Sequence, residues 1–132
     1  MITFVDTNIL LDVFLPDPDH GEKSARYLER TFKEGSLIIN EIIYAELAPH
    51  FTNQNQLDNA LATLGIRIVS LDQEVGYKAG IAWKKYRNSG GKRDRILSDF
   101  LIGAHTQVKA DRLLTRDRGF YRKYFKGLMV IY

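Results

Sequence analysis

Short β-rich runs alternate with helical segments along the whole chain, and this alternation limits the fold more than any other feature of the sequence. The strand-like runs are residues 2–5, 37–39, 66–69, 112–114 and 128–131. Between them, apolar residues recur at helical spacing, as at Val75, Ala79 and Ala82. Parallel strands require crossover connections, which helices usually supply. We therefore predict an α/β fold with three α/β/α layers around a central, mainly parallel sheet of four to five strands.

The expected helices lie at residues 7–14, 20–34, 42–47, 57–64, 73–86 and 96–108. Asp19 and Asp72 stand where helix N-caps are expected, and residues 88–93 form the clearest loop. A chain of 132 residues can bury one core but not two independent ones, so we expect a single domain over residues 1–132.

Composition excludes several classes of protein. The chain has no cysteine, so it has neither disulfides nor thiolate metal sites. Its N-terminus reaches Asp6 before an apolar signal region could form, and no apolar stretch approaches the ~20 residues of a membrane span. We expect a cytoplasmic protein with no membrane contact.

The net charge of +3 is the sum of two parts of the chain with opposite net charges. Residues 1–83 carry six basic and twelve acidic side chains, whereas residues 84–132 carry thirteen basic and four acidic ones. The basic C-terminal third suggests a polyanionic partner, although clustered lysines and arginines more often form an ordinary solvated face.

The positions of four acidic residues indicate a candidate functional site. Asp6 follows the first strand and Asp117 follows the 112–114 strand, so both should face the crevice beyond the carboxyl ends of the sheet. Glu46 and Asp99 lie within apolar helical stripes. Taken singly, each has a structural explanation as a helix cap or a solvated residue. Together, four carboxylates at one edge would repel one another unless cations were bound or their pKa values were raised.

The donor types indicate which cation would fit. Carboxylates without cysteine or paired histidines favour Mg²⁺ or Mn²⁺ over zinc. His20, His50 and His105 are scattered, and we interpret His105 as a polar position on a buried helix. Carboxylate-bound divalent cations are suited to phosphodiester hydrolysis.

Four segments, 4–10, 44–47, 98–104 and 114–120, resemble the four motifs of PIN-domain nucleases. Their order and spacing match over nearly the whole chain, and its length is most similar to VapC-type toxins of toxin–antitoxin pairs. The resemblance implies an Mg²⁺- or Mn²⁺-dependent endoribonuclease with Asp6, Glu46, Asp99 and Asp117 as its catalytic and metal-binding quartet. It implies that Thr7, Asn8 and Thr115 support the site.

The resemblance also implies the partners of such a protein. They are an RNA substrate, a second copy of the chain in a homodimer, and a small antitoxin through which operator DNA is bound. The sequence departs from the family pattern at Gly103 and Thr106, where alanine is frequent, and at residues 48–49, which interrupt the helix after Glu46. Asp94 is either an accessory ligand or a helix cap.

Basic residues flank the third and fourth acids. For RNA contact we select Lys92, Arg93, Arg95, Arg116 and Arg118, because arginine matches phosphate well. Tyr121, Tyr124 and Phe125 are placed either to stack on bases or to pack in the core, and we favour the core.

Other functions fit parts of the pattern. A catalytically silent RNA- or protein-binding module and a housekeeping RNA-processing nuclease both stay open. A haloacid-dehalogenase-type phosphatase would need a second aspartate where Asn8 stands, so the sequence disfavours it. A 5′-nuclease would bring more acids and further DNA-binding elements.

Overall fold

The fold is known from a computed structural model, which describes residues 1–91 and 95–132. Its strands are β1 (Ile2–Val5), β2 (Ser36–Ile39), β3 (Ile66–Ile68), β4 (Arg112–Leu114) and β5 (Val130–Ile131). Its helices are α1 (Thr7–Phe14), α2 (Gly21–Glu34), α3 (Glu41–Leu47), the 3₁₀ turn η1 (Ala48–His50), α4 (Gln54–Thr63), α5 (Gln73–Asn88), α6 (Leu97–Lys109) and α7 (Arg118–Tyr124).

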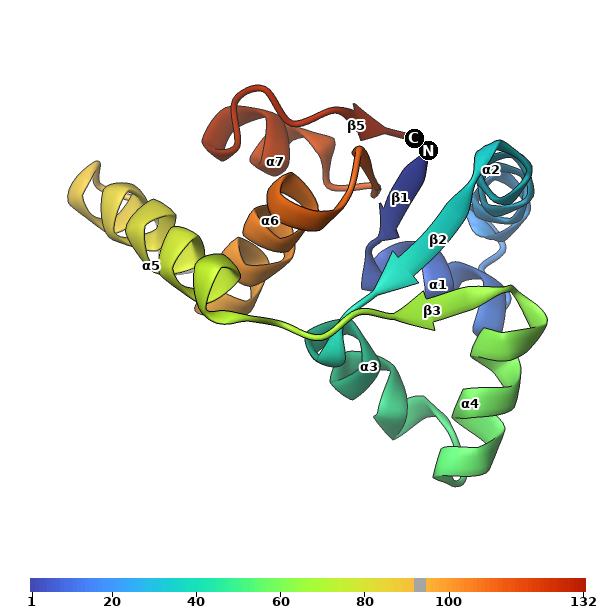
Figure 1. The fold of residues 1–132 in the computed structure, drawn as a ribbon. Helices are drawn as coiled ribbons and strands as arrows, with labels where there is room; N and C mark the ends of the chain where they lie inside the picture. The colour runs from blue at the N-terminus through green and yellow to red at the C-terminus, as the bar shows by residue number, and fades with distance from the viewer. Residues whose placement is uncertain (92–94) are drawn as a thin grey trace.

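The five strands form one sheet in the order β3-β2-β1-β4-β5, and every described pairing is parallel (Figure 1). The expected α/β architecture is confirmed, with five strands that are all parallel. In the central strand, Phe4 and Val5 are fully buried, as are Leu113 and Leu114 in β4. Strands covered on both faces read as continuous apolar runs, which is why their positions could be predicted.

Helices cover the two faces of this sheet. On one face α6 packs against the strands and α5 packs against α6, while α1 and α2 pack against each other on the other side (Figure 1). An aromatic cluster joins α6 to α7, with the Phe100 and Phe120 rings 5.3 Å apart and edge to face. Gly103 belongs to this contact, because a Cβ added there would lie 2.4 Å from the Phe125 ring. The glycine at residue 103 thus makes room for Phe125.

Three local details differ from expectation. Helix α2 begins at Gly21 with His20 at its N-cap, and the ring of His20 pairs with Asp17, so the prediction of Asp19 as the cap is wrong. Residues 118–124 form a helix that the sequence pattern did not reveal, because its aromatic and basic residues alternate closely. The last strand spans only two residues.

No helix among the described residues is long and apolar enough to cross a membrane. Lys92, Arg93 and Asp94, which we selected for RNA contact or as an accessory acid, lie outside the described residues.

Candidate active site at the carboxyl edge of the sheet

Asp6 is the buried centre of the candidate site. It follows β1 directly, and its backbone N–H donates to the Leu114 carbonyl at the end of β4, 2.9 Å away. Its side chain is only 7% exposed and accepts hydrogen bonds from the Thr7 backbone N–H at 2.8 Å and from Thr115 Oγ1 at 2.7 Å. Asp6 also caps α1. The structural role and the candidate functional role therefore coexist in one residue.

Burial perturbs the Asp6 carboxyl. Desolvation raises the pKa of Asp6 to about 6, and the negative charges of Glu46 and Asp99 add to that rise. The hydrogen bonds from Thr115 and Thr7 oppose it but do not cancel it. The three acids thus act on one another electrostatically, as expected for a carboxylate cluster at the edge of the sheet.

Three polar residues hold Asp6 and Glu46 in place. Thr7 Oγ1 donates to Glu46 Oε1 at 2.8 Å, which ties the start of α1 to α3. Asn8 Nδ2 lies 3.3 Å from both Asp6 Oδ2 and Thr115 Oγ1. Glu46 is exposed and not buried in an apolar stripe as the spacing suggested. Its hydrogen bond from Thr7 nevertheless holds it at the same edge of the sheet as Asp6. Helix α3 ends at Leu47, and the 3₁₀ turn follows directly.

Asp99 and Asp117 approach the same edge from α6 and from the segment after β4. Asp99 is half-buried, and its Oδ2 accepts from the Ile96 backbone N–H at 3.2 Å, so it caps α6. Asp117 receives both terminal nitrogens of Arg95, with Nη2 to Oδ1 at 3.1 Å. The Asp117 carboxylate is thus already paired with the Arg95 guanidinium.

Tyr121 of α7 lies beneath the acids. It is buried, and desolvation together with the charges of Asp6, Asp99 and Asp117 raises the pKa of its phenol. The sequence marked this tyrosine only as a core or stacking residue. Three of the four selected acids thus lie near enough to Tyr121 to act on it electrostatically.

The donor set suits a hard cation, because it consists of carboxylate and hydroxyl oxygens. Within residues 1–91 and 95–132, however, no three acids or histidines are close enough to hold an ion as they stand. The Arg95 guanidinium occupies the Asp117 carboxylate, which fits this observation. The residues therefore match Mg²⁺ or Mn²⁺ in chemistry, with Asp117 engaged elsewhere.

The basic residues selected for RNA contact have different surroundings. Arg95 packs on the Phe120 ring, 4.2 Å from its centroid, besides pairing with Asp117. Arg116 makes a bidentate pair with buried Asp12, with Nε to Oδ2 at 2.8 Å and Nη2 to Oδ1 at 2.9 Å. Arg118 is exposed at the start of α7. Arg116 thus compensates a buried charge, which the sequence could not show because Asp12 looks like an ordinary helix residue.

His105 is fully buried, as part of a link between α3 and α6. Its Nδ1 lies 2.9 Å from Asn40 Nδ2, and Asn40 Oδ1 accepts from Ile43 N–H to cap α3. Its Nε2 has no hydrogen-bond partner among the described residues. That His105 is not a ligand stays a prediction.

The fold is an all-parallel α/β sheet. Carboxylates from the end of β1, from α3, from α6 and from the end of β4 lie toward one edge of it. The PIN domain family model matches residues 3–126, and the chain belongs to the PIN domain family. Members of this family are typically nucleases that use divalent metals.

Solved structures with the same fold include toxins crystallised in toxin–antitoxin complexes. VapBC2 from Rickettsia felis, bound to a DNA fragment from its promoter, is 20% identical with a TM-score of 0.74, over 99% of this chain and 98% of that one. FitAcB from Neisseria gonorrhoeae is 23% identical with a TM-score of 0.72, over 100% and 97%. VapC20 from Mycobacterium tuberculosis, a sarcin–ricin loop cleaving toxin, is 13% identical with a TM-score of 0.60, over 89% and 93%. No curated protein matches the sequence.

Proposed function

We propose that the protein is a metal-dependent endoribonuclease and the toxin of a VapBC-type toxin–antitoxin pair. The observation that carries this proposal is the buried Asp6 carboxyl, which accepts from Thr7 N–H and Thr115 Oγ1 and is tied to Glu46 through the Thr7 hydroxyl. Burial, with smaller contributions from the charges of Glu46 and Asp99, raises its pKa to about 6. A divalent cation at this edge would stabilise the ionised Asp6 carboxylate and offset its repulsion with the neighbouring acids. Membership of the PIN domain family and the likeness to VapC and FitB folds support it.

In this proposal Asp6, Glu46, Asp99 and Asp117 hold Mg²⁺ or Mn²⁺. A divalent cation at this edge would help to ionise a water and would neutralise charge on the phosphate. Thr115 and the Thr7 N–H fix the Asp6 carboxylate, the Thr7 hydroxyl orients Glu46, and Asn8 braces Asp6 against Thr115. Asp117 becomes available when its pair with Arg95 opens, and the Arg95 and Arg118 guanidinium groups can then bind RNA phosphate.

The test compares cleavage of a structured RNA by wild type, Asp6→Asn and Asp99→Asn, in Mg²⁺ or Mn²⁺ and in EDTA. We expect cleavage only by wild type with metal. Asp19→Asn is the matched control, because Asp19 is exposed and lies outside the cluster. Equal cleavage by wild type and both site variants would contradict the assignment.

A catalytically silent binding module is the second candidate, since the described residues hold no preformed metal site and Asp117 is paired with Arg95. It predicts RNA binding without cleavage in any metal. Induced expression followed by end mapping of total RNA separates the remaining candidates. Growth arrest with one discrete cut supports a toxin, whereas scattered cuts without arrest support an RNA-processing nuclease.

The proposed partners follow from solved structures with the same fold, among them VapBC2 bound to a DNA fragment from its promoter and a toxin–antitoxin complex from Klebsiella pneumoniae. We propose a cytoplasmic homodimer, inhibited by a small antitoxin through which it reaches operator DNA. Co-purification with the product of a neighbouring small gene, and loss of RNA cleavage in that complex, would support this assignment. Unchanged cleavage in the complex would contradict it.

A further inference from the structure

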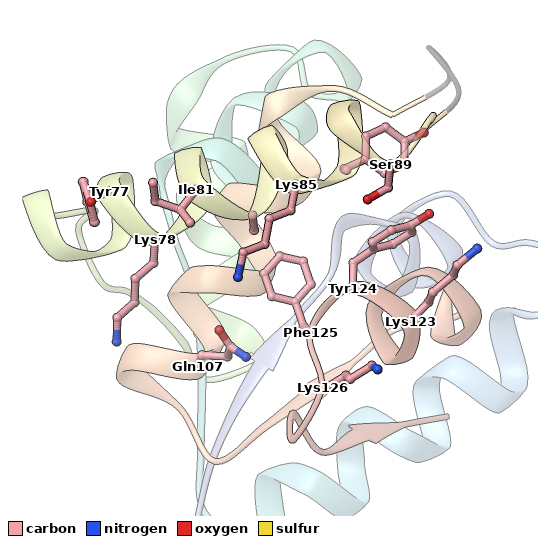
Figure 2. Close-up of a pocket in the computed structure, with 12 residues that line it drawn as sticks. Tyr77, Lys78, Ile81, Lys85, Ser89, Gln107, Lys123, Tyr124, Phe125 and Lys126 are labelled. Atoms are coloured by element: carbon pink, nitrogen blue, oxygen red, sulfur yellow. The ribbon is translucent and has the colours of Figure 1, made fainter.

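A basic groove runs beside the candidate active site, between α5 and α7. Its main cavity has a volume of about 710 Å³. Figure 2 shows Lys78 and Lys85 on the α5 side and Lys123, Tyr124 and Lys126 on the other. No acidic side chain lines this cavity among the described residues. We call the cavity, with its continuation described next, the α5–α7 groove.

The groove extends to Arg95, the side chain that pairs with Asp117 of the candidate active site. A second cavity of about 360 Å³ shares Lys123 and Tyr124 with the first and is also lined by Arg95 and Gly119. Arg95 holds the Asp117 carboxylate, and Gly119 lies two residues after that acid. An extended chain that lies in the groove therefore reaches Arg95, next to the Asp117 carboxylate.

The charge of the groove is available for a ligand. Lys78 forms an ion pair with Glu74 at 3.3 Å, but none of the described carboxylates pairs with Lys85, Lys123 or Lys126. Lys123 lies over the Tyr124 ring, 5.3 Å from its centroid. Three such ammonium groups along one groove favour a ligand with regularly spaced negative charges.

The tyrosines of the groove indicate a second property of its ligand. Tyr77 is 73% exposed near the start of α5 and lines the same cavity. Tyr124 is half-buried, with its ring edge to face with Tyr86 at 5.0 Å. Ammonium groups next to exposed aromatic faces bind unpaired nucleotides, whose phosphates meet the charges while the bases stack.

We infer that the α5–α7 groove binds the single-stranded RNA that flanks the cleavage site, through Lys85, Lys123 and Lys126. This inference rests on the proposed function, since it makes the groove the path of the substrate. Charge alone would also attract an acidic protein segment. Continuity with Arg95 and Asp117 favours RNA, because a substrate must pass the reacting atoms and a partner protein need not.

Direct binding tests the groove without relying on catalysis. Wild type is titrated in EDTA with a fluorescent 12-nucleotide oligo-uridine at several salt concentrations, together with Lys85→Ala/Lys123→Ala/Lys126→Ala. We expect the triple variant to bind on the order of tenfold or more weakly, and its salt slope to fall by about 2, at ~0.7 for each phosphate that is no longer neutralised. Matching thermal unfolding temperatures verify that the variant is folded.

The matched control is Lys23→Ala/Lys33→Ala/Lys84→Ala, which removes the same charge. Lys84 stands next to Lys85 on α5 but does not line the groove, and Lys23 and Lys33 lie on α2. We expect the control to keep most of the wild-type affinity and salt slope. Equal losses in the two triple variants would show that only net charge matters and would overturn the inference.

Two further measurements separate this inference from the proposed function. If wild type cleaves RNA but the groove variant binds and cleaves like wild type, the groove is wrong and the nuclease stands. If the groove variant loses oligo-uridine binding but wild type never cleaves, the groove stands and the nuclease is wrong. If the groove variant loses affinity for an acidic peptide but not for oligo-uridine, the groove accepts a protein segment and the RNA inference is overturned.

Discussion

Asp6→Asn should stabilise the folded protein at alkaline pH and destabilise it at acidic pH. The pKa of Asp6 is raised from 3.8 to about 6, chiefly by burial. The folded protein therefore binds a proton that the unfolded chain releases between these two values, so the stability of wild type falls as pH rises through this window. A shift of this size corresponds to about 3 kcal/mol, at 1.36 kcal/mol per pKa unit.

The substitution removes the charge and also the oxygen that accepts hydrogen bonds from Thr115 Oγ1 and Asn8 Nδ2. The asparagine oxygen can still accept from the Thr7 N–H, whereas its amide nitrogen cannot accept from Thr115 Oγ1 at 2.7 Å or from Asn8 Nδ2 at 3.3 Å. Because the second of these bonds is long, we expect the loss to cost about 1 kcal/mol. We therefore expect Asp6→Asn to be about 2 kcal/mol more stable than wild type at pH 8 and about 1 kcal/mol less stable near pH 4. At pH 8 this corresponds to a rise of roughly 6–8 °C in Tm.

Urea unfolding in EDTA at pH 4, 6 and 8 measures this difference, with the exposed-acid variant Asp19→Asn as the control. Chelation is essential, because a bound cation would offset the cost of ionised Asp6 in wild type alone. A difference between Asp6→Asn and wild type that is independent of pH would refute the reasoning. So would a loss of stability in the variant at pH 8.

Three further changes test the packing around the site. Arg116→Ala should cost about 3 kcal/mol of unfolding free energy because it leaves Asp12 buried and unpaired, and adding Asp12→Asn should restore part of the loss. Gly103→Ala should cost about 1–3 kcal/mol, since its Cβ would press on the Phe125 ring, and Phe125→Leu should relieve it. Burial lowers the pKa of His105, so wild type should lose stability as pH falls below about 6.5. Urea unfolding of His105→Gln should show a smaller loss of stability over the same pH range, and an equal pH dependence in the two proteins would contradict this prediction.

The sequence predicted the features that depend on one element at a time. Fully buried parallel strands appear as apolar runs, and the rule that sites lie beyond the carboxyl ends of such strands selected Asp6 and Asp117 before any contact was known. The cap of α5 at Asp72 was predicted and is confirmed by its bond from the Val75 N–H at 3.0 Å. These features need no knowledge of which elements meet.

The features that sequence reasoning missed depend on two elements at once. Arg116 was selected for RNA, but its partner Asp12 lies 104 residues away on α1. The pair between Arg95 and Asp117 likewise needs α6 and α7 to be docked before it can be seen. Helix α7 is stabilised by the aromatic contacts of Phe120 with α6, so its residues alone carried too weak a signal.

The fold also explains why the net charge says little about RNA binding. Asp6, Glu46 and Asp99 gather at the sheet edge, while the Arg95 guanidinium compensates the Asp117 carboxylate. The repulsion that the edge offers to a phosphate is therefore weaker than four free carboxylates would produce. On the adjoining surface, Lys85, Lys123 and Lys126 of the α5–α7 groove have no ion-pair partner among the described carboxylates. Since potentials act over about 10 Å at moderate salt, a strand in the groove experiences these lysines far more than the acids of the distant α2 and α4 helices.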